Sequence, residues 1–278
     1  MIKELITNRA SVFNLPTMAT AAVKPKKIKT DQGIWAAPLA SLKLEANEIH
    51  VWAARLDAEN ILESERVISA DEGVRADRFR FETHRNQFIA ARGVLRRVLG
   101  EYLHSEPREL RFQYGKFGKP AIADEHLTGI KFNISHSENL ALFAVTRERE
   151  IGVDIERINS SMVDAEMILQ CLTEQEKSYL FALPLDKRDI FFFECWTRKE
   201  AFMKGCGKGL AIPPNEIETL SFTNSSPDFP EGGAGFRPFQ WSLQTIPFIP
   251  GHAAALAAAA AGTETRLRFW KYSDGDLF

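Results

Sequence analysis

The sequence predicts an α+β fold: a pseudo-twofold pair of duplicated α/β subdomains, each with a long helix packed on a small, mostly antiparallel sheet. Three observations predict it. Residues 151–156 alternate like a strand, residues 190–204 have the composition of a helix, and a diverged repeat recurs about a hundred residues along the chain. The chain has 278 residues, of which 45% are hydrophobic, so it can bury the core that this fold requires.

The strand at residues 151–156 carries two carboxylates on one face. Isoleucine or valine occupies positions 151, 153 and 155, whereas Asp154 and Glu156 take the alternate positions with Gly152. Because successive side chains of an extended chain point to opposite faces, the apolar residues should face a core and both carboxylates should share the other face. A solvated edge strand would show the same pattern, so this is one of two interpretations.

The helix at residues 190–204 lacks glycine and proline. Trp196, Glu200 and Lys204 are spaced four residues apart and therefore lie along one side of it. Together with the carboxylates of the strand, they supply the oxygen ligands that Mg²⁺ requires and a cation for phosphate. A surface ion pair between Glu200 and Lys204 is the alternative interpretation.

The internal repeat relates residues 48–56 to residues 150–158, where Glu, Ile, Val and Arg recur in matching places. At nearly the same offset, residues 84–88 match residues 187–191. Each half should therefore run strand, long helix, strand, strand. Only the second copy carries the three acids, so we expect one asymmetric site at the junction between the halves, where pockets are common.

The repeat divides the chain into an N-terminal subdomain at residues 36–148 and a C-terminal subdomain at residues 149–278, which carries the acids. Residues 2–30 contain one acidic residue, Glu4, and a cluster of lysines. We expect a flexible or loosely docked leader over residues 1–35, with Met18 as an alternative start.

Composition argues against several classes of protein. The formal net charge of −2 disfavours a nucleic-acid partner, because such binding needs a basic excess. The apolar runs are too short to span a bilayer, so no membrane partner is expected. The three cysteines lack paired spacing and indicate reduced thiols, so we expect a cytoplasmic protein.

Three further motifs could contact an anion. Residues 115–120 form a turn-rich loop with two lysines. Residues 132–137 resemble a buried strand that ends in Ser-His-Ser, and arginines gather at residues 75–92, where their planar groups suit phosphate. Each motif has an ordinary alternative, namely a solvent loop, a capped turn or a solvated helix face.

Taken together and in this order, four motifs resemble the 4′-phosphopantetheinyl transferases, specifically the long single-chain (Sfp-type) class. They are Gly-Lys-Pro at residues 118–120, Phe-Asn-Ile-Ser-His-Ser at 132–137, Gly-Val-Asp-Ile-Glu at 152–156, and Trp-Thr-Arg-Lys-Glu-Ala at 196–201 followed by Lys204. The resemblance implies an enzyme of the holo-[acyl-carrier-protein] synthase type. Such an enzyme moves the phosphopantetheine arm of coenzyme A onto a serine of an apo acyl or peptidyl carrier protein, and it releases adenosine 3′,5′-bisphosphate. It also implies a monomer, because this class resembles two fused copies of a smaller unit.

The resemblance implies a role for each site residue. Asp154, Glu156 and Glu200 would ligate Mg²⁺ together with the pyrophosphate of coenzyme A. Lys204 would lie beside the phosphates and stabilise the leaving oxygen. The residues that would bind the nucleotide portion of coenzyme A are Arg85, Lys119, Pro120, Ser135 and His136.

A base must accept the proton of the attacking serine. Glu200 is our candidate, directly or through a water, and Asp154 is less suited because a ligand on a strand can hardly turn outward. Two other functions stay open: another Mg²⁺-dependent phosphotransferase or phosphodiesterase that uses the same acids, or a non-catalytic binder of coenzyme A or of a carrier protein.

Overall fold

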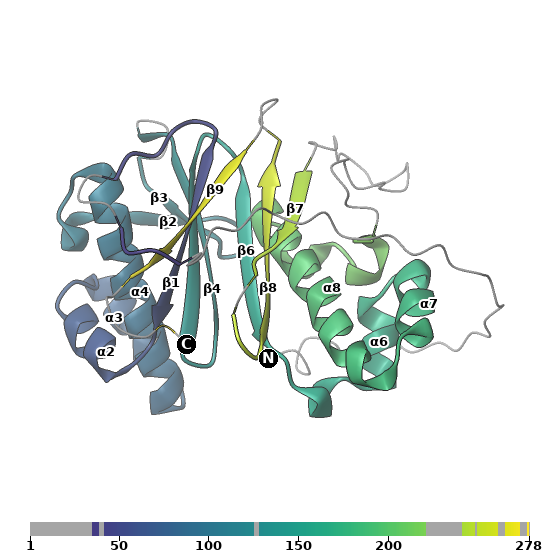
Figure 1. Ribbon diagram of the computed structural model, residues 1–278. Helices are drawn as coiled ribbons and strands as arrows, with labels where there is room; N and C mark the ends of the chain where they lie inside the picture. The colour runs from purple at the N-terminus through teal and green to yellow at the C-terminus, as the bar shows by residue number, and fades with distance from the viewer. Residues whose placement is uncertain are drawn as a thin grey trace.

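The computed structural model describes residues 35–38, 42–124, 128–220, 241–247, 249–260, 265–272 and 277. Two β-sheets stand next to each other in the middle of the molecule, and helices cover the outer side of each (Figure 1). This arrangement confirms the α+β class. Apart from Trp35, the expected leader lies outside the described residues. Across the described ranges, none of the helices is both long and apolar enough to span a bilayer.

The N-terminal half begins with a strand and continues through three helices to a small hairpin and two longer strands. Its last helix ends where His104 takes a left-handed conformation, with φ of 49°. The elements are β1 (Glu48–Arg55), α2 (Ala58–Glu65), α3 (Ala70–Ala76), α4 (Glu82–Leu103), a 3₁₀ turn (Pro107–Glu109), β2 (Phe112–Tyr114), β3 (Pro120–Ile122), β4 (Ile130–Ser137) and β5 (Leu140–Arg147).

The C-terminal half repeats the order of strand, two short helices, long helix and strands. The predicted helix at residues 190–204 is confirmed and extends further at both ends. It stops at Gly207, whose φ of 64° suits glycine at a helix C-terminus. The elements are β6 (Ile151–Arg157), a 3₁₀ turn (Ser160–Met162), α6 (Ala165–Cys171), α7 (Glu174–Ala182), α8 (Leu185–Cys206), 3₁₀ turns (Gly209–Ala211 and Pro214–Glu216), β7 (Trp241–Thr245), β8 (His252–Ala259) and β9 (Arg266–Lys271).

The two main sheets share one strand order. The first runs β4-β5-β1-β9 and the second runs β6-β8-β7, so β1-β5-β4 corresponds to β6-β8-β7. Strand β9 extends the first sheet by pairing parallel to β1, so the last strand of the chain lies in the sheet of the first half (Figure 1). The common strand order agrees with a repeat, and the pseudo-twofold relation between the halves stays a prediction.

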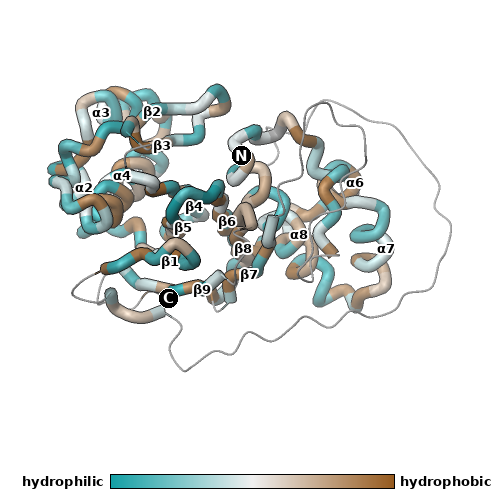
Figure 2. The backbone as a smooth tube through the Cα atoms, turned by 90° about the horizontal axis from the view of Figure 1, so that it is seen from above, coloured by the Kyte–Doolittle hydropathy of each residue, from teal (hydrophilic) through white to brown (hydrophobic). Residues whose placement is uncertain are grey.

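Apolar side chains fill the spaces between successive layers. Helix α4 packs on the first sheet through residues such as Leu95, and Val51 and Val153 meet between the sheets. On the outer face of the second sheet, Ala255 and Ala257 of β8 pack against α8. Seen from above, the strands lie between the two groups of helices, with β4 and β6 as neighbours (Figure 2). The alanines of β8 allow α8 to lie close to its sheet, because a small side chain adds little thickness.

Each long helix also pairs at least one buried cation with a glutamate of a short helix. Arg96 of α4 donates to Glu72 of α3, with Nε and Oε2 2.6 Å apart. Lys199 of α8 donates to Glu176 of α7, with Nζ and Oε2 2.5 Å apart. Both glutamates also accept a hydrogen bond from the backbone amide three residues earlier, at the start of their own helices. The same kind of ion pair therefore joins short helix to long helix in both halves.

Candidate active site

Strand β6 presents its carboxylates toward helix α8. The predicted alternation is confirmed, because Ile151, Val153 and Ile155 lie in the core between the sheets. Asp154 lies on the other face, beside Ala255 of β8, where α8 covers the sheet. That face is not solvated: only 1% of Asp154 is exposed. The interpretation of this face as solvated is therefore wrong for Asp154.

The two carboxylate oxygens of Asp154 have different surroundings. Oδ1 accepts a hydrogen bond from the Ser135 hydroxyl at 2.8 Å and another from the Lys204 ammonium at 2.6 Å. Lys204 also donates to the Ser135 hydroxyl at 2.9 Å. Oδ2 is buried and has no hydrogen-bond partner among the described residues. A buried carboxylate oxygen without a partner is costly, so this atom is suited to a ligand.

Glu156 of β6 and Glu200 of α8 complete an acidic cluster around Asp154. Burial, together with the charge of Asp154, raises the pKa of Glu156 to about 7 and the pKa of Glu200 to about 7. Burial disfavours the charged form of Lys204, but the three carboxylates outweigh it and raise the pKa of its ammonium. The cluster therefore contains three carboxyl groups and one ammonium. A further cation would reduce the repulsion between the carboxylates.

The cluster has the chemistry that a Mg²⁺ ion needs. Carboxylate oxygens are hard ligands, and the partnerless Oδ2 of Asp154 offers one such donor directly. Among the described residues, no three His, Cys, Asp or Glu side chains are already arranged closely enough to hold a metal ion. The chemistry of these donors fits the ion, and Asp154, Glu156 and Glu200 are the residues that would hold it.

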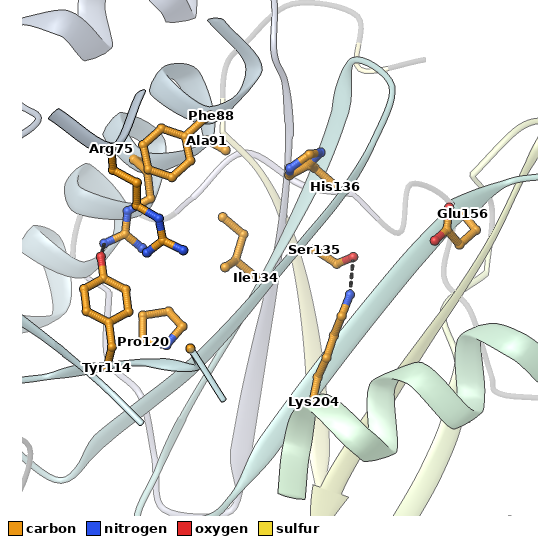
Figure 3. A pocket seen from close by; sticks show the side chains of 12 residues that line it. Arg75, Phe88, Ala91, Tyr114, Pro120, Ile134, Ser135, His136, Glu156 and Lys204 are labelled. Carbon is orange, nitrogen blue, oxygen red and sulfur yellow. Dashed lines mark hydrogen bonds between the residues drawn. The ribbon is translucent and has the colours of Figure 1, made fainter. Parts of the chain in front are cut away.

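A pocket of about 260 Å³ opens beside this cluster, and both halves line it. Figure 3 shows Lys204, Ser135 and Glu156 on one side, and Arg75, Phe88 and Tyr114 on the other, with His136 between them. The complete lining is Arg75, Phe88, Ala91, Arg92, Tyr114, Gly118, Pro120, Ile134, Ser135, His136, Glu156 and Lys204. A pocket is therefore present where the sequence predicts a site, and the roles of its residues stay predictions.

One wall of the pocket combines arginines with aromatic rings. The guanidinium carbon of Arg75 lies 5.1 Å from the ring centre of Tyr114 and 5.8 Å from that of Phe88. Arg92 donates to the Tyr114 hydroxyl at 3.3 Å and pairs with the buried Glu72. The cluster of arginines in the sequence pointed to this wall, whereas nothing in the sequence singled out Tyr114 or Phe88.

The nucleotide-binding residues expected from the resemblance divide into two groups. Ser135, His136 and Pro120 line the pocket. Arg85 does not line it, because its guanidinium faces Asp77, with Nε and Oδ1 3.3 Å apart. Lys119 also lies outside the lining.

The ammonium of Lys119, which belongs to the N-terminal half, instead contacts two elements of the C-terminal half. It donates to the backbone carbonyls of Ile151 at 3.1 Å and Gly205 at 2.7 Å, and to the carboxylate of Glu150 at 3.1 Å. These contacts join the start of β6 to the end of α8. The sequence could not reveal this, since a lysine in a turn looks the same whether it faces a ligand or a carbonyl.

Strand β6 and helix α8 approach each other closely at two glycines. A Cβ placed on Gly152 would lie 1.9 Å from the carbonyl oxygen of Ala201 and 2.4 Å from the amide nitrogen of Gly205. Gly152 is thus required by the distance between the two backbones, whereas a Cβ on Gly205 would first meet the ring of Trp241, 2.6 Å away. Asp154 and Lys204 lie next to this close approach, so the distance between β6 and α8 determines how far apart these two residues lie.

Family models match both halves of the chain. Residues 150–259 match the "4′-phosphopantetheinyl transferase superfamily", and residues 52–148 match "4′-phosphopantetheinyl transferase, N-terminal". The 4′-phosphopantetheinyl transferase HetI of Nostoc sp. is 35% identical over 244 residues, which is 87% of this chain and 99% of that protein. This chain belongs to the 4′-phosphopantetheinyl transferase superfamily. The resemblance noted in the sequence is therefore confirmed.

Other members of the superfamily match over shorter ranges. A putative 4′-phosphopantetheinyl transferase of Synechocystis sp. is 31% identical and covers 72% of this chain and 80% of its own. The 4′-phosphopantetheinyl transferase Sfp of Bacillus subtilis is 30% identical and covers 52% of this chain and 63% of its own. A solved holo-[acyl-carrier-protein] synthase of Thermotoga maritima aligns over 42% of this chain and 64% of its own, with 24% identity and a TM-score of 0.31.

Proposed function

We propose that this protein transfers the 4′-phosphopantetheine arm of coenzyme A to a serine of an apo acyl or peptidyl carrier protein. The reaction needs Mg²⁺ and releases adenosine 3′,5′-bisphosphate. The observation that carries the proposal is the buried Asp154, with one partnerless oxygen and with Lys204 beside it, at the side of a pocket that both halves line. Membership of the superfamily supports the same activity.

Three carboxylates would hold the metal, namely those of Asp154, Glu156 and Glu200. When bound, Mg²⁺ neutralises the pyrophosphate oxygens and so lowers the barrier to attack by a serine hydroxyl. Lys204 keeps its ammonium charged next to these acids, so it binds the phosphates and stabilises the oxygen that leaves. Positioning and electrostatics thus supply most of the catalysis.

Glu200 is the base that we assign to the attacking serine, directly or through a water. Its raised pKa of about 7 gives it the basicity to accept a proton near neutral pH. Asp154 is held by hydrogen bonds from Ser135 and Lys204, which leaves it little freedom to receive a proton from a second substrate.

The nucleotide end of coenzyme A would occupy the wall of arginines and aromatic rings. Arg75 is available to the phosphate on the ribose, and Ser135, His136 and Pro120 line the same space. We propose Arg75 rather than Arg85 for this phosphate, because Arg85 is paired with Asp77 at the surface.

We further propose that the two halves are duplicated copies related by a pseudo-twofold axis. The common strand order and the matching ion pairs at Glu72 and Glu176 support this. The chain would act as a monomer, since both halves of one molecule line the pocket. A cytoplasmic location would agree with its three free cysteines.

The test is the intact mass of an apo carrier protein after incubation with coenzyme A and Mg²⁺. A gain of one phosphopantetheine group, absent with Asp154→Asn, supports the transfer. No gain with a panel of fatty-acid, polyketide and peptide carriers would overturn it. Hydrolysis of coenzyme A without a carrier would favour a phosphodiesterase, and binding without any reaction would favour a non-catalytic binder.

A further inference from the structure

Strand β6, which carries two of the acids, is an edge strand. Its sheet runs β6-β8-β7, so one row of its backbone groups faces away from β8. The neighbour on that side is β4, the edge strand of the other sheet (Figure 2). Among the described residues, β4 forms its backbone ladder with β5 only. The free edge of β6 must therefore be satisfied in another way.

Side chains of β4 satisfy it. The amide of Val153 donates to Oδ1 of Asn133 at 2.9 Å, and the amide of Arg157 donates to Oγ of Ser137 at 2.9 Å. Between them, the Ser135 hydroxyl donates to Asp154. These three polar residues alternate along β4, so they share the face toward β6. We call Asn133, Ser135 and Ser137, together with Lys119, the seam.

Lys119 continues the seam beyond the end of β4. Its ammonium binds the carbonyl of Ile151, which belongs to the same outward row of β6 as the amide of Val153. It also binds the carbonyl of Gly205, the residue after Lys204. One side chain therefore fixes β6 and α8 to each other.

Apolar packing alone cannot fix the position of β6 relative to the first sheet. The sheets meet through Val51, Leu142 and Val153, among others, and such contact fixes the spacing between layers. The ladder to β8 holds β6 within its own sheet. Apolar contact is non-directional, however, and allows one sheet to shift along the other. Hydrogen bonds restrict that shift, because their strength falls steeply with distance and angle. Asn133 holds the residue directly before Asp154, where a shift matters most.

We propose that Asn133, Ser137 and Lys119 are positioning residues that fix strand β6 against the first sheet and helix α8, so that Asp154 and Glu156 stay aligned with Glu200 and Lys204. None of the three lines the pocket, so this role requires no contact with substrate. The proposal rests on the metal site of the proposed function. Partners behind metal ligands are typically worth 10- to 100-fold in metal affinity.

The test compares Asn133→Leu with Thr146→Val. Asn133→Leu keeps the volume and removes the acceptor of the Val153 amide. Thr146 is also buried in the first sheet, and its hydroxyl donates to the carbonyl of Glu48, far along the sheet from the acids. The control therefore also removes a buried hydrogen bond between a side chain and the backbone, although here the side chain donates and also accepts from Arg149. Binding of Mn²⁺ to each full-length protein is measured by electron paramagnetic resonance without coenzyme A.

We expect Asn133→Leu to weaken Mn²⁺ binding by about 10- to 100-fold and Thr146→Val to change it by less than about 2-fold. In the transfer assay, Asn133→Leu should raise the KM for Mg²⁺ while the KM for coenzyme A stays within about 2-fold. Should Asn133→Leu fail to fold, Ser137→Ala at the end of β4 replaces it, and we expect the same direction.

Three outcomes would overturn the inference. Equal Mn²⁺ affinity in wild type, Asn133→Leu and Ser137→Ala would show that the seam does not position the acids, and the proposed function would stand. Equal weakening in Thr146→Val would show a general loss of stability instead. If the wild type itself bound no Mn²⁺, the metal site of the proposed function would fall and the inference with it.

Discussion

Replacing Gly152 by alanine should separate strand β6 from helix α8. The new methyl group would lie 1.9 Å from the carbonyl oxygen of Ala201, 2.4 Å from the amide nitrogen of Gly205 and 2.8 Å from its Cα, whereas ordinary contact begins at 3.4 Å. All three are backbone atoms, so no side chain can turn away. Helix and strand must move apart by roughly 1.5 Å at this point.

The expected cost follows from that displacement. Overfilling a packed core typically costs about 1–3 kcal/mol, and a clash with backbone belongs at the upper end, so we expect a loss of about 3 kcal/mol in the free energy of unfolding. Asp154 and Lys204 lie two residues and one residue from the two glycines, and their 2.6 Å contact would open. A misplacement of about 1 Å can cost 10²-fold in rate, so transfer to the carrier should fall by about that factor.

Urea unfolding measures the stability and intact-mass kinetics measure the transfer. Gly73→Ala is the matched control, because no described atom outside the backbone of helix α3 lies within 4 Å of the Cβ that it adds. That change should stabilise the protein by about 0.5–1 kcal/mol and leave transfer unaltered. If Gly152→Ala were as stable and as active as Gly73→Ala, the argument from close approach would be refuted.

Three further predictions concern the buried charges. Lys199→Met should lower the free energy of unfolding by about 3–5 kcal/mol, because it leaves the fully buried Glu176 without its cation; a loss below about 1 kcal/mol in urea unfolding would contradict this. Glu200→Gln should reduce turnover by at least about 10²-fold and alter the dependence on Mg²⁺; near-normal turnover with unchanged Mg²⁺ dependence would remove both roles from Glu200. The affinity for Mg²⁺ should rise from about pH 6 to about pH 8, because the pKa values of Glu156 and Glu200 are raised to about 7 and a cation must displace their protons. Calorimetry in buffers of different ionisation enthalpy would detect those protons, and a pH-independent affinity without proton release would speak against the assignment.

The sequence alone was sufficient to predict the two elements that carry the acids, β6 and α8. A period of two in β6 and a run without glycine or proline in α8 are local signals, and both elements are confirmed. A site between the halves was also predicted from the sequence, since Asp154, Glu156 and Glu200 all lie in the second half. The pocket brings Ser135, His136 and Lys204 together as expected.

Other features depend on tertiary contacts that no local pattern encodes. Lys119 and Arg85 carry the cationic groups expected of phosphate ligands. In the structure, however, Lys119 donates to backbone carbonyls and Arg85 pairs with Asp77. Tyr114 reaches the pocket only because the small β2–β3 hairpin places it opposite Arg75. The Ser69/Glu72 and Thr173/Glu176 spacings at helix starts were a further usable signal for the predicted repeat, and the alignment of strands left them out.

The return of β9 to the first sheet makes the chain hard to divide. A cut between β5 and β6 would deprive the first half of the strand that covers β1 and of Arg268, which pairs with Glu48. Removing the C-terminal segment from β9 onward would leave the edge of β1 bare, and a bare edge is a template for another chain. Shortened forms of this protein should therefore aggregate rather than survive as separate lobes, and the intact chain should melt in one step.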